Sequence, residues 1–274
     1  MTSTPTIAKP MTRGEAYRRD GYAIVREALP AALVAAARDQ LDALIGGLAP
    51  DQRPENLVEP HMRAPDWHFW LDLCRHPAVL ERIGECLGAD ELILMMSHLI
   101  VKPAGDGRAV AWHQDNTYWP TVDGTDVTTV WLALDDVDLG NACMRVIPRS
   151  QVGYPELEML KTDGSDLLNV RVDVSAEQVA SAMPIELARG EFSLHDSFVI
   201  HGSDANCSDR RRAGYTMRYA NATTTRVDLA RHWSPVYYVR GNGRSLAPGM
   251  RDLRPGCPLP ATPEIMRNPG PMDG

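Results

Sequence analysis

The sequence lacks the features that would point to a nucleic-acid or membrane protein. Its 28 basic side chains are outnumbered by 36 acidic ones, and the formal charge of −8 disfavours binding to phosphate backbones. No stretch approaches the roughly 18 consecutive apolar residues of a membrane span. Residues 1–10 lack the apolar run of a secretory signal, so we expect a cytoplasmic protein without nucleic-acid or membrane partners.

Cysteines and linker segments are also scarce. The five cysteines form an odd set, and none belongs to a CxxC pair of the kind that binds zinc or performs dithiol chemistry. We therefore expect reduced thiols. No Ser/Gly-rich or charge-block segment divides the chain, which favours a single domain over residues 1–274.

Two kinds of pattern follow one another along the chain. Residues 1–90 are predicted to be mostly helical, because apolar residues recur at steps of three and four. Short β-rich runs separated by Gly, Pro and Asp then fill residues 91–222, which is typical of an antiparallel sandwich or barrel with helices packed outside it. The proline-rich residues 223–274 are predicted to be an extension draped over this core.

One segment of the helical part has an unusual composition. Residues 49–68 are polar, are punctuated by proline, and carry His61, Arg63 and Trp67. Such a composition suits a mobile cover, so we predict a lid over the mouth of the barrel.

The strongest local signal is the sequence Trp112-His113-Gln114-Asp115 at the end of a predicted strand. Residues two apart in a strand share a face, so His113 and Asp115 present an imidazole and a carboxylate to one point. An apolar strand ends 88 residues downstream in His201. Two histidines and a carboxylate on one face of a metal are typical of non-haem Fe(II) oxygenases, whereas zinc usually requires a fourth ligand or a nearby base.

A basic cluster precedes the strand at residues 213–219. The last of its three arginines, Arg212, adjoins the strand, and a guanidinium fixed near the metal would bind a carboxylate through two hydrogen bonds. The obvious carboxylate is a co-substrate that also chelates iron. We interpret Arg210 and Arg211 as solvent-facing.

Four ordered motifs together resemble the phytanoyl-CoA dioxygenase family over roughly residues 12–241. They are His-Gln-Asp at 113–115, Trp-Leu-Ala-Leu-Asp-Asp-Val at 131–137, Asn-Ala-Cys-Met-Arg-Val-Ile-Pro at 141–148, and the segment 201–212. The resemblance implies an Fe(II)- and 2-oxoglutarate-dependent oxygenase that uses O2. It also implies a mainly β fold with flanking helices, whose core is a double-stranded β-helix of the jelly-roll, cupin-like kind.

The resemblance also assigns roles to individual residues. It implies that His113, Asp115 and His201 are the catalytic iron ligands. Arg212 matches the position that pairs with the distal carboxylate of 2-oxoglutarate, and Ser203 matches a hydroxyl that assists it. Lys102 corresponds to a position near the 2-oxoglutarate pocket, although a surface lysine is an equal alternative. The carboxylate at Asp115 argues against halogenation, because halogenating relatives have a small residue there.

The expected reaction is hydroxylation of an unactivated C–H bond of a small polar or natural-product molecule, with release of succinate and CO2. Desaturation or cyclisation would use the same residues. The candidate substrate contacts are Arg63, Tyr118, Trp119, Arg145, Trp233 and Arg240. His195, six residues before His201, is interpreted as a hydrogen-bonded structural histidine. Two alternatives stay open: a non-catalytic cupin-like module that binds a metal or ligand, and a zinc hydrolase.

Overall fold

The computed structural model describes residues 11–55 and 57–263, so the prediction about residues 1–10 lies outside the described part. An eight-stranded sheet and a four-stranded sheet form the body of the protein. The large sheet runs in the order β1 (Tyr22–Val25), β11 (Phe192–Asp196), β6 (Val127–Ala133), β13 (Arg212–Asn221), β3 (Leu92–Lys102), β15 (Tyr237–Arg240) and β16 (Arg251–Asp252), with β2 (Leu57–Val58) also paired to β3. The small sheet runs β10 (Met183–Pro184), β7 (Arg145–Val146), β12 (His201–Ser203) and β4 (Val110–His113).

Two short ribbons and the helices complete the description. The ribbons pair β14 (Arg226–Val227) with β5 (Val122–Asp123), and β8 (Leu160–Lys161) with β9 (Val170–Arg171). The helices are α1 (Arg13–Asp20), α2 (Ala31–Gly46), α3 (Pro60–Arg63), α4 (Trp67–Cys74), α5 (Pro77–Leu87) and α6 (Ala176–Ser181), with short 3-10 helices η1 (Asp115–Tyr118) and η2 (Leu139–Asn141). None of the helices within these residues is both long and apolar enough to cross a membrane.

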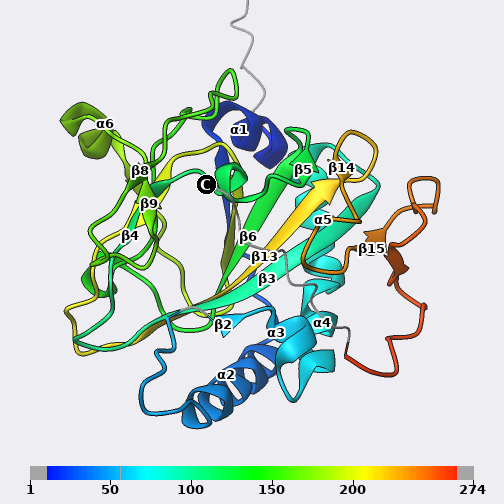
Figure 1. Ribbon diagram of the computed structural model, residues 1–274, viewed down its shortest axis with the longest axis horizontal. Coiled ribbons are helices and arrows are strands. Elements are labelled where there is room, and N and C mark those ends of the chain that lie inside the picture. The colour runs from blue at the N-terminus through cyan, green and yellow to red at the C-terminus, as the bar shows by residue number, and fades with distance from the viewer. Residues whose placement is uncertain (1–10, 56, 264–274) are drawn as a thin grey trace, which may run out of the picture.

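The central strand β13 explains how the layers form. Its residues alternate between two faces, and one face carries Tyr215, Met217 and Tyr219, which join the core shared with the helices. The hydroxyl of Tyr219 donates to the carbonyl of Cys74 in α4 at 2.6 Å. Helices α2, α3 and α4 lie along one side of the large sheet and β4 lies on the other (Figure 1). The predicted mainly β fold with flanking helices and a jelly-roll core is therefore confirmed.

Residues 49–68 have a different place from the predicted lid. Within this segment β2 pairs with β3, and Glu55, Glu59 and His61 are buried. Glu55 accepts hydrogen bonds from Arg53 and Arg108. None of the described residues of the segment lines the cavity between the sheets. The polar residues of this segment instead include buried carboxyl groups that bond to neighbouring parts of the frame.

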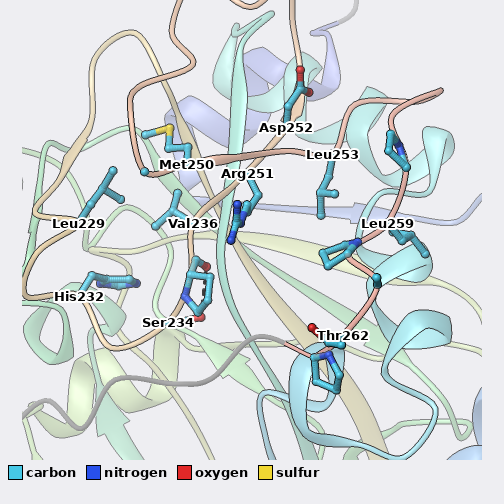
Figure 2. A pocket seen from close by; sticks show the side chains of 16 residues that line it. Leu229, His232, Ser234, Val236, Met250, Arg251, Asp252, Leu253, Leu259 and Thr262 are labelled. Atoms are coloured by element: carbon cyan, nitrogen blue, oxygen red, sulfur yellow. Dashed lines mark hydrogen bonds between the residues drawn. The ribbon is translucent and has the colours of Figure 1, made fainter.

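The C-terminal part is more regular than the sequence predicts. After β14, strand β15 pairs antiparallel with β3, and β16 pairs parallel with β15, so both extend the large sheet. A wide groove of about 940 Å³ lies between residues 229–236 and residues 249–263. Figure 2 shows His232 and Ser234 on one side of this groove and Leu259 and Thr262 on the other.

Candidate active site

A cavity of about 360 Å³ lies between the two sheets and contains the predicted metal ligands. It is smaller than the C-terminal groove, but none of the three predicted ligands lines that groove. The candidate active site is therefore the inner cavity. Its walls are formed by Met96, His98, Ile100, Val110, His113, Asp115, Tyr118, Trp119, Thr129, Trp131, Met144, Leu167, Leu168, His195, His201, Gly202, Ser203, Arg212, Thr216, Arg218 and Trp233.

The three predicted ligands meet at one point. His113 ends β4 and pairs in register with His201 at the start of β12, while Asp115 opens η1 directly after β4. The Nε2 atoms of His113 and His201 lie 3.7 Å and 3.9 Å from Oδ1 of Asp115. One ligand atom from each residue lies within 4.8 Å of the other two. The structure brings together residues 88 positions apart in the sequence.

Backbone carbonyls orient both histidines. Nδ1 of His113 lies 2.8 Å from the carbonyl of Ala111, and Nδ1 of His201 lies 3.0 Å from the carbonyl of Val199. An Nδ1–H that donates to a carbonyl leaves the Nε2 lone pair free for a metal. Burial and the neighbouring histidines hold the pKa of His201 well below its usual range, which favours the neutral, ligating form.

Two residues that the sequence analysis did not place at the metal site contact the carboxylate. Thr129 on β6 donates from Oγ1 to Oδ2 of Asp115 at 2.5 Å, and Nε2 of His195 on β11 lies 3.3 Å from the same oxygen. Burial by itself would raise the pKa of Asp115, but the surrounding histidines and Arg218 hold that pKa well below its ordinary value. The other carboxylate oxygen of Asp115, Oδ1, faces His113 and His201. His195 thus lines the active cavity, and neither of its ring nitrogens has a hydrogen-bond partner among the described residues.

The donor set fits a first-row transition metal. Two imidazole nitrogens and one carboxylate oxygen are the ligands of the facial-triad Fe(II) oxygenases. Among the described residues, no other group of three or more His, Cys, Asp or Glu side chains is arranged to hold a metal. A cavity on one side of the triad leaves room for further ligands.

Arg212 fits the predicted role in 2-oxoglutarate binding. It is buried, its Nε donates to the carbonyl of Ala142 at 3.0 Å, and its Nη2 donates to Oγ of Ser203 at 3.1 Å. Nη1 is buried and has no partner in the described structure. The guanidinium carbon lies 5.1 Å from the ring centroid of Trp131. A buried donor without an acceptor is costly, and an anionic ligand carboxylate would satisfy it.

The other basic residues of this region have structural partners. Lys102 is buried rather than on the surface, donates to the carbonyls of Ser203 and Asp204, and does not line the cavity. Burial and the charge of Arg212 lower the pKa of Lys102 to about 6. Arg210 is exposed and pairs with Asp138 at 2.7 Å. Arg211, predicted to face solvent, is half-buried and pairs with Asp135 at 2.8 Å and with Asp42.

The predicted substrate contacts divide into two groups. Tyr118, Trp119 and Trp233 line the cavity. The other three are arginines, Arg63, Arg145 and Arg240, and none of them lines the cavity.

The three arginines that lie elsewhere have their own partners. The side chain of Arg145 donates to the carbonyl of Val179 at 2.8 Å, and its guanidinium lies over the ring of Trp112. The side chain of Arg240 donates to the carbonyl of Leu80 in α5. Arg63 lies on α3, beside a separate shallow hollow. The role of these three in substrate binding therefore stays a prediction that the lining of the cavity does not support.

Known proteins resemble this chain along most of its length. A family model described as phytanoyl-CoA dioxygenase (PhyH) matches residues 17–214. Phytanoyl-CoA dioxygenase domain-containing protein 1 from Bos taurus is 28% identical over 196 residues, which cover 70% of this chain and 64% of that protein. L-proline trans-4-hydroxylase from Streptomyces griseoviridis is 27% identical over 259 residues, which cover 85% of this chain and 93% of that protein.

A solved structure agrees with the fold. The epimerase SnoN, in complex with Fe3+, alpha ketoglutarate and nogalamycin RO, has a TM-score of 0.64 at 20% sequence identity, covering 93% of this chain and 94% of that chain. The chain spans 50% to 64% of the length of the first curated relatives that it matches. The family model, the His-Asp-His cluster and the shared fold lead to one conclusion: the chain belongs to the phytanoyl-CoA dioxygenase family, which uses Fe(II), 2-oxoglutarate and O2.

Proposed function

We propose that this protein is an Fe(II)/2-oxoglutarate-dependent dioxygenase that hydroxylates an unactivated C–H bond of a small polar or natural-product molecule. The observation that carries the proposal is the position of the unpartnered Nη1 of Arg212 in the wall of the same cavity as His113, Asp115 and His201. A metal triad alone would suit many reactions, but a buried arginine without an acceptor beside the triad suits an oxygenase that uses an anionic co-substrate.

Each residue has a distinct part in this proposal. His113, Asp115 and His201 hold the metal, while Thr129 orients the Asp115 carboxylate through a hydrogen bond and His195 lies beside the same oxygen. Arg212 and Ser203 bind the distal carboxylate of 2-oxoglutarate, and Lys102 holds the backbone that carries Ser203. Fe(II) with 2-oxoglutarate and O2 supplies oxidation of a C–H bond, with release of succinate and CO2. The apolar walls exclude water from this reaction.

The size and lining of the cavity support a small substrate. A volume of about 360 Å³ is near the lower end of ligand pockets, and 2-oxoglutarate takes part of that space. Trp119, Trp233 and Tyr118 give the remainder aromatic walls. L-proline trans-4-hydroxylase, which this chain matches over 93% of that protein's length, acts by its name on L-proline, a small amino acid. The substrate partner is therefore proposed to be a small molecule.

The cellular location belongs to the same proposal. All five cysteines are free thiols, three of them buried. Free thiols persist where the compartment is reducing, which supports a cytoplasmic enzyme.

Succinate formation tests the proposal directly. The purified protein is incubated with Fe(II), 2-oxoglutarate and O2 in the presence of candidate small molecules, and both succinate and the modified compound are identified by mass spectrometry. A product heavier by one oxygen atom supports hydroxylation, whereas loss of two hydrogen atoms indicates desaturation or cyclisation. Absence of Fe(II)-dependent succinate formation would favour the non-catalytic module, and activity with zinc in the absence of oxygen would favour a hydrolase.

A further inference from the structure

A second buried arginine lies on the same face of β13 as Arg212. Arg218 is six residues further along the strand, so alternation directs both side chains to the cavity, and both line it. Arg218 is 7% exposed. Across the sheet it pairs in register with Met96 on β3 and with Thr129 on β6. Because Thr129 donates a hydrogen bond to Asp115, Arg218 lies near the predicted metal ligands and away from Arg212.

The guanidinium of Arg218 is only partly satisfied. Its Nη1 donates to Oγ1 of Thr216 at 2.6 Å, which is its one hydrogen bond within the described residues. Its Nε is buried and has no partner. No aspartate or glutamate of the described chain forms an ion pair with it within 4.0 Å. A buried cation in this state is costly, and such groups are otherwise paired.

The nearest charged and titratable groups do not neutralise Arg218. Asp115 and Glu59 are the acids close enough to act on its charge, and His98 and His195 also face this part of the cavity. Asp115 is a predicted metal ligand, so its negative charge is shared with the metal. Burial raises the pKa of Glu59 to about 8, which leaves that carboxyl mainly protonated at neutral pH. The positive charge of Arg218 therefore lacks a full counter-ion inside the protein.

We propose that Arg218 binds a carboxylate of the substrate, so that the substrates of this enzyme are organic acids or amino acids that fit the cavity. The inference rests on the proposed function and names the substrate class for the same site. Two further observations indicate which kind of ligand Arg218 binds and distinguish that ligand from 2-oxoglutarate.

The free edge of the guanidinium suits a planar anion. Because Thr216 engages Nη1, the Nε and Nη2 donors remain, and these two N–H groups form a fork that matches the two oxygens of a carboxylate. Six residues of extended chain place the two Cα atoms about 20 Å apart, so a single carboxylate cannot bind both guanidinium groups. In this proposal Arg212 binds the distal carboxylate of 2-oxoglutarate, and Arg218 binds a different carboxylate.

Binding without turnover tests this proposal. Wild-type protein loaded with Fe(II) and 2-oxoglutarate under anaerobic conditions is titrated in a calorimeter with matched pairs of compounds, each a carboxylic acid and its primary amide. The pairs start with L-proline and L-prolinamide and continue through larger aliphatic and aromatic acids up to the size of the cavity. We expect saturable binding of at least one acid, about tenfold or more tighter than its amide.

Variants connect that preference to Arg218. Arg218→Gln should abolish the acid-over-amide preference, and Arg218→Lys should retain a weaker preference because it keeps the charge but loses the fork. Both should bind 2-oxoglutarate with unchanged affinity. Arg210→Gln, on the exposed surface, is the control and should behave as wild type. The melting temperature of Arg218→Gln should be equal to or above that of wild type, because an unpaired buried charge has been removed.

The outcomes separate the two proposals. If wild-type protein does not bind 2-oxoglutarate, the proposed function is wrong, and this inference, which depends on it, is wrong as well. If 2-oxoglutarate binds but no acid in the panel does, or acids and amides bind equally, the inference alone fails. Retention of acid preference in Arg218→Gln, or weaker 2-oxoglutarate binding in that variant, would also overturn it. If Arg218→Gln does not fold, Arg218→Lys and Arg218→Met decide by the same criteria.

Discussion

At the scale of single residues, contacts within the protein orient the predicted metal ligands. The Nδ1 atoms of His113 and His201 each contact a carbonyl two residues earlier, and Thr129 donates to one oxygen of Asp115. These contacts leave two nitrogens and one oxygen directed to a common point. Replacing one of the three metal-binding side chains should therefore abolish function, whereas the fold does not depend on that side chain.

We therefore predict that His113→Ala, Asp115→Ala and His201→Ala each abolish Fe(II) binding and turnover while the metal-free protein remains folded. Calorimetric titration with Fe(II) under anaerobic conditions measures the binding, and circular dichroism checks the fold. His195→Gln, which changes the contacts to Asp115 and to the ring of His201, should weaken Fe(II) binding roughly 10- to 100-fold. Near wild-type oxidation by two of the three alanine variants would contradict the ligand assignment.

The co-substrate arginine gives a second residue-scale prediction. Arg212→Lys keeps the charge but loses the paired geometry, so 2-oxoglutarate should bind more weakly by about 1.5–3 kcal/mol, or roughly ten- to a hundredfold. Fe(II) affinity should be nearly unchanged, because Arg212 is not a ligand. Titration with 2-oxoglutarate gives the affinities.

The two neighbouring arginines are matched controls for Arg212. Arg210→Lys alters only an exposed ion pair and should leave the affinity for 2-oxoglutarate unchanged. Arg211→Lys should also bind 2-oxoglutarate normally but should lower stability, since Arg211 connects Asp135 to Asp42 on α2. A larger loss of affinity in either control than in Arg212→Lys would show that the wrong arginine was assigned.

At the scale of elements, residues 49–68 connect the helices to the large sheet. Glu59 is fully buried, its Oε2 accepts from the backbone N–H of Ser97 at 3.0 Å, and it lies 3.3 Å from Nδ1 of His61. Burial raises the pKa of Glu59 to about 8, from 4.5. Between these two values the carboxyl of Glu59 keeps its proton in the native state, whereas the same carboxyl has lost it in the unfolded chain. The free energy of unfolding therefore falls as pH rises toward 8.

Glu59→Gln should remove this pH dependence. Between pH 6 and pH 8, the wild-type protein should lose roughly 2–3 kcal/mol of unfolding free energy relative to the variant, because one pKa unit corresponds to about 1.4 kcal/mol. Denaturant unfolding at several pH values gives both curves. The exposed substitution Glu177→Gln serves as the control and should follow wild type. Parallel curves for Glu59→Gln and wild type would mean that Glu59 is ionised in the native state.

Hydrogen exchange distinguishes residues 57–63 from the segment between β8 and β9, which lines the cavity. The N–H of Glu59 donates to the carbonyl of Ser97 at 2.8 Å, so amides of residues 57–63 should be protected equally with and without Fe(II) and 2-oxoglutarate. Leu167 and Leu168, between β8 and β9, line the cavity instead. Exchange there should slow when both ligands bind. Ligand-dependent protection confined to residues 57–63 would restore the lid interpretation.

Local spacing in the sequence predicts that His113 and Asp115 lie together, and they do so at the end of β4 and the start of η1. The position of Arg212 at the start of β13 follows from the order of the motifs. Thr129 and His195 were not assigned to the metal site, because they reach Asp115 from strands whose register across the sheet no local pattern encodes. Arginine side chains are the least predictable: Arg145 and Arg240 have backbone carbonyl partners that only the tertiary structure reveals.

At the scale of the whole molecule, ligand binding and folding are coupled. The metal ligands come from two strands and a 3-10 helix, so only the native chain holds them together. A ligand that binds only the native state at 100 times its Kd stabilises it by about 2.7 kcal/mol. For a chain of this length the melting temperature should rise by roughly 5–10 °C.

Differential scanning calorimetry tests this coupling. Protein treated with a chelator should melt at the lower temperature, and Fe(II) together with 2-oxoglutarate should raise the melting temperature more than Fe(II) alone. Asp115→Ala should show no rise with Fe(II). An equal rise in that variant would mean that the metal binds elsewhere.

The alternation of β13 has a consequence for folding specificity. A shift of one residue in its pairing would turn Arg212 and Arg218 toward the helices and place Tyr215, Met217 and Tyr219 in the cavity. Two guanidinium groups would then be buried against an apolar layer without acceptors, and the hydroxyl of Tyr219 would lose its bond to α4. Misregistered states are thereby separated from the native state by a large energy gap. The two arginines that line the cavity therefore also favour the native pairing of β13 over its shifted alternatives.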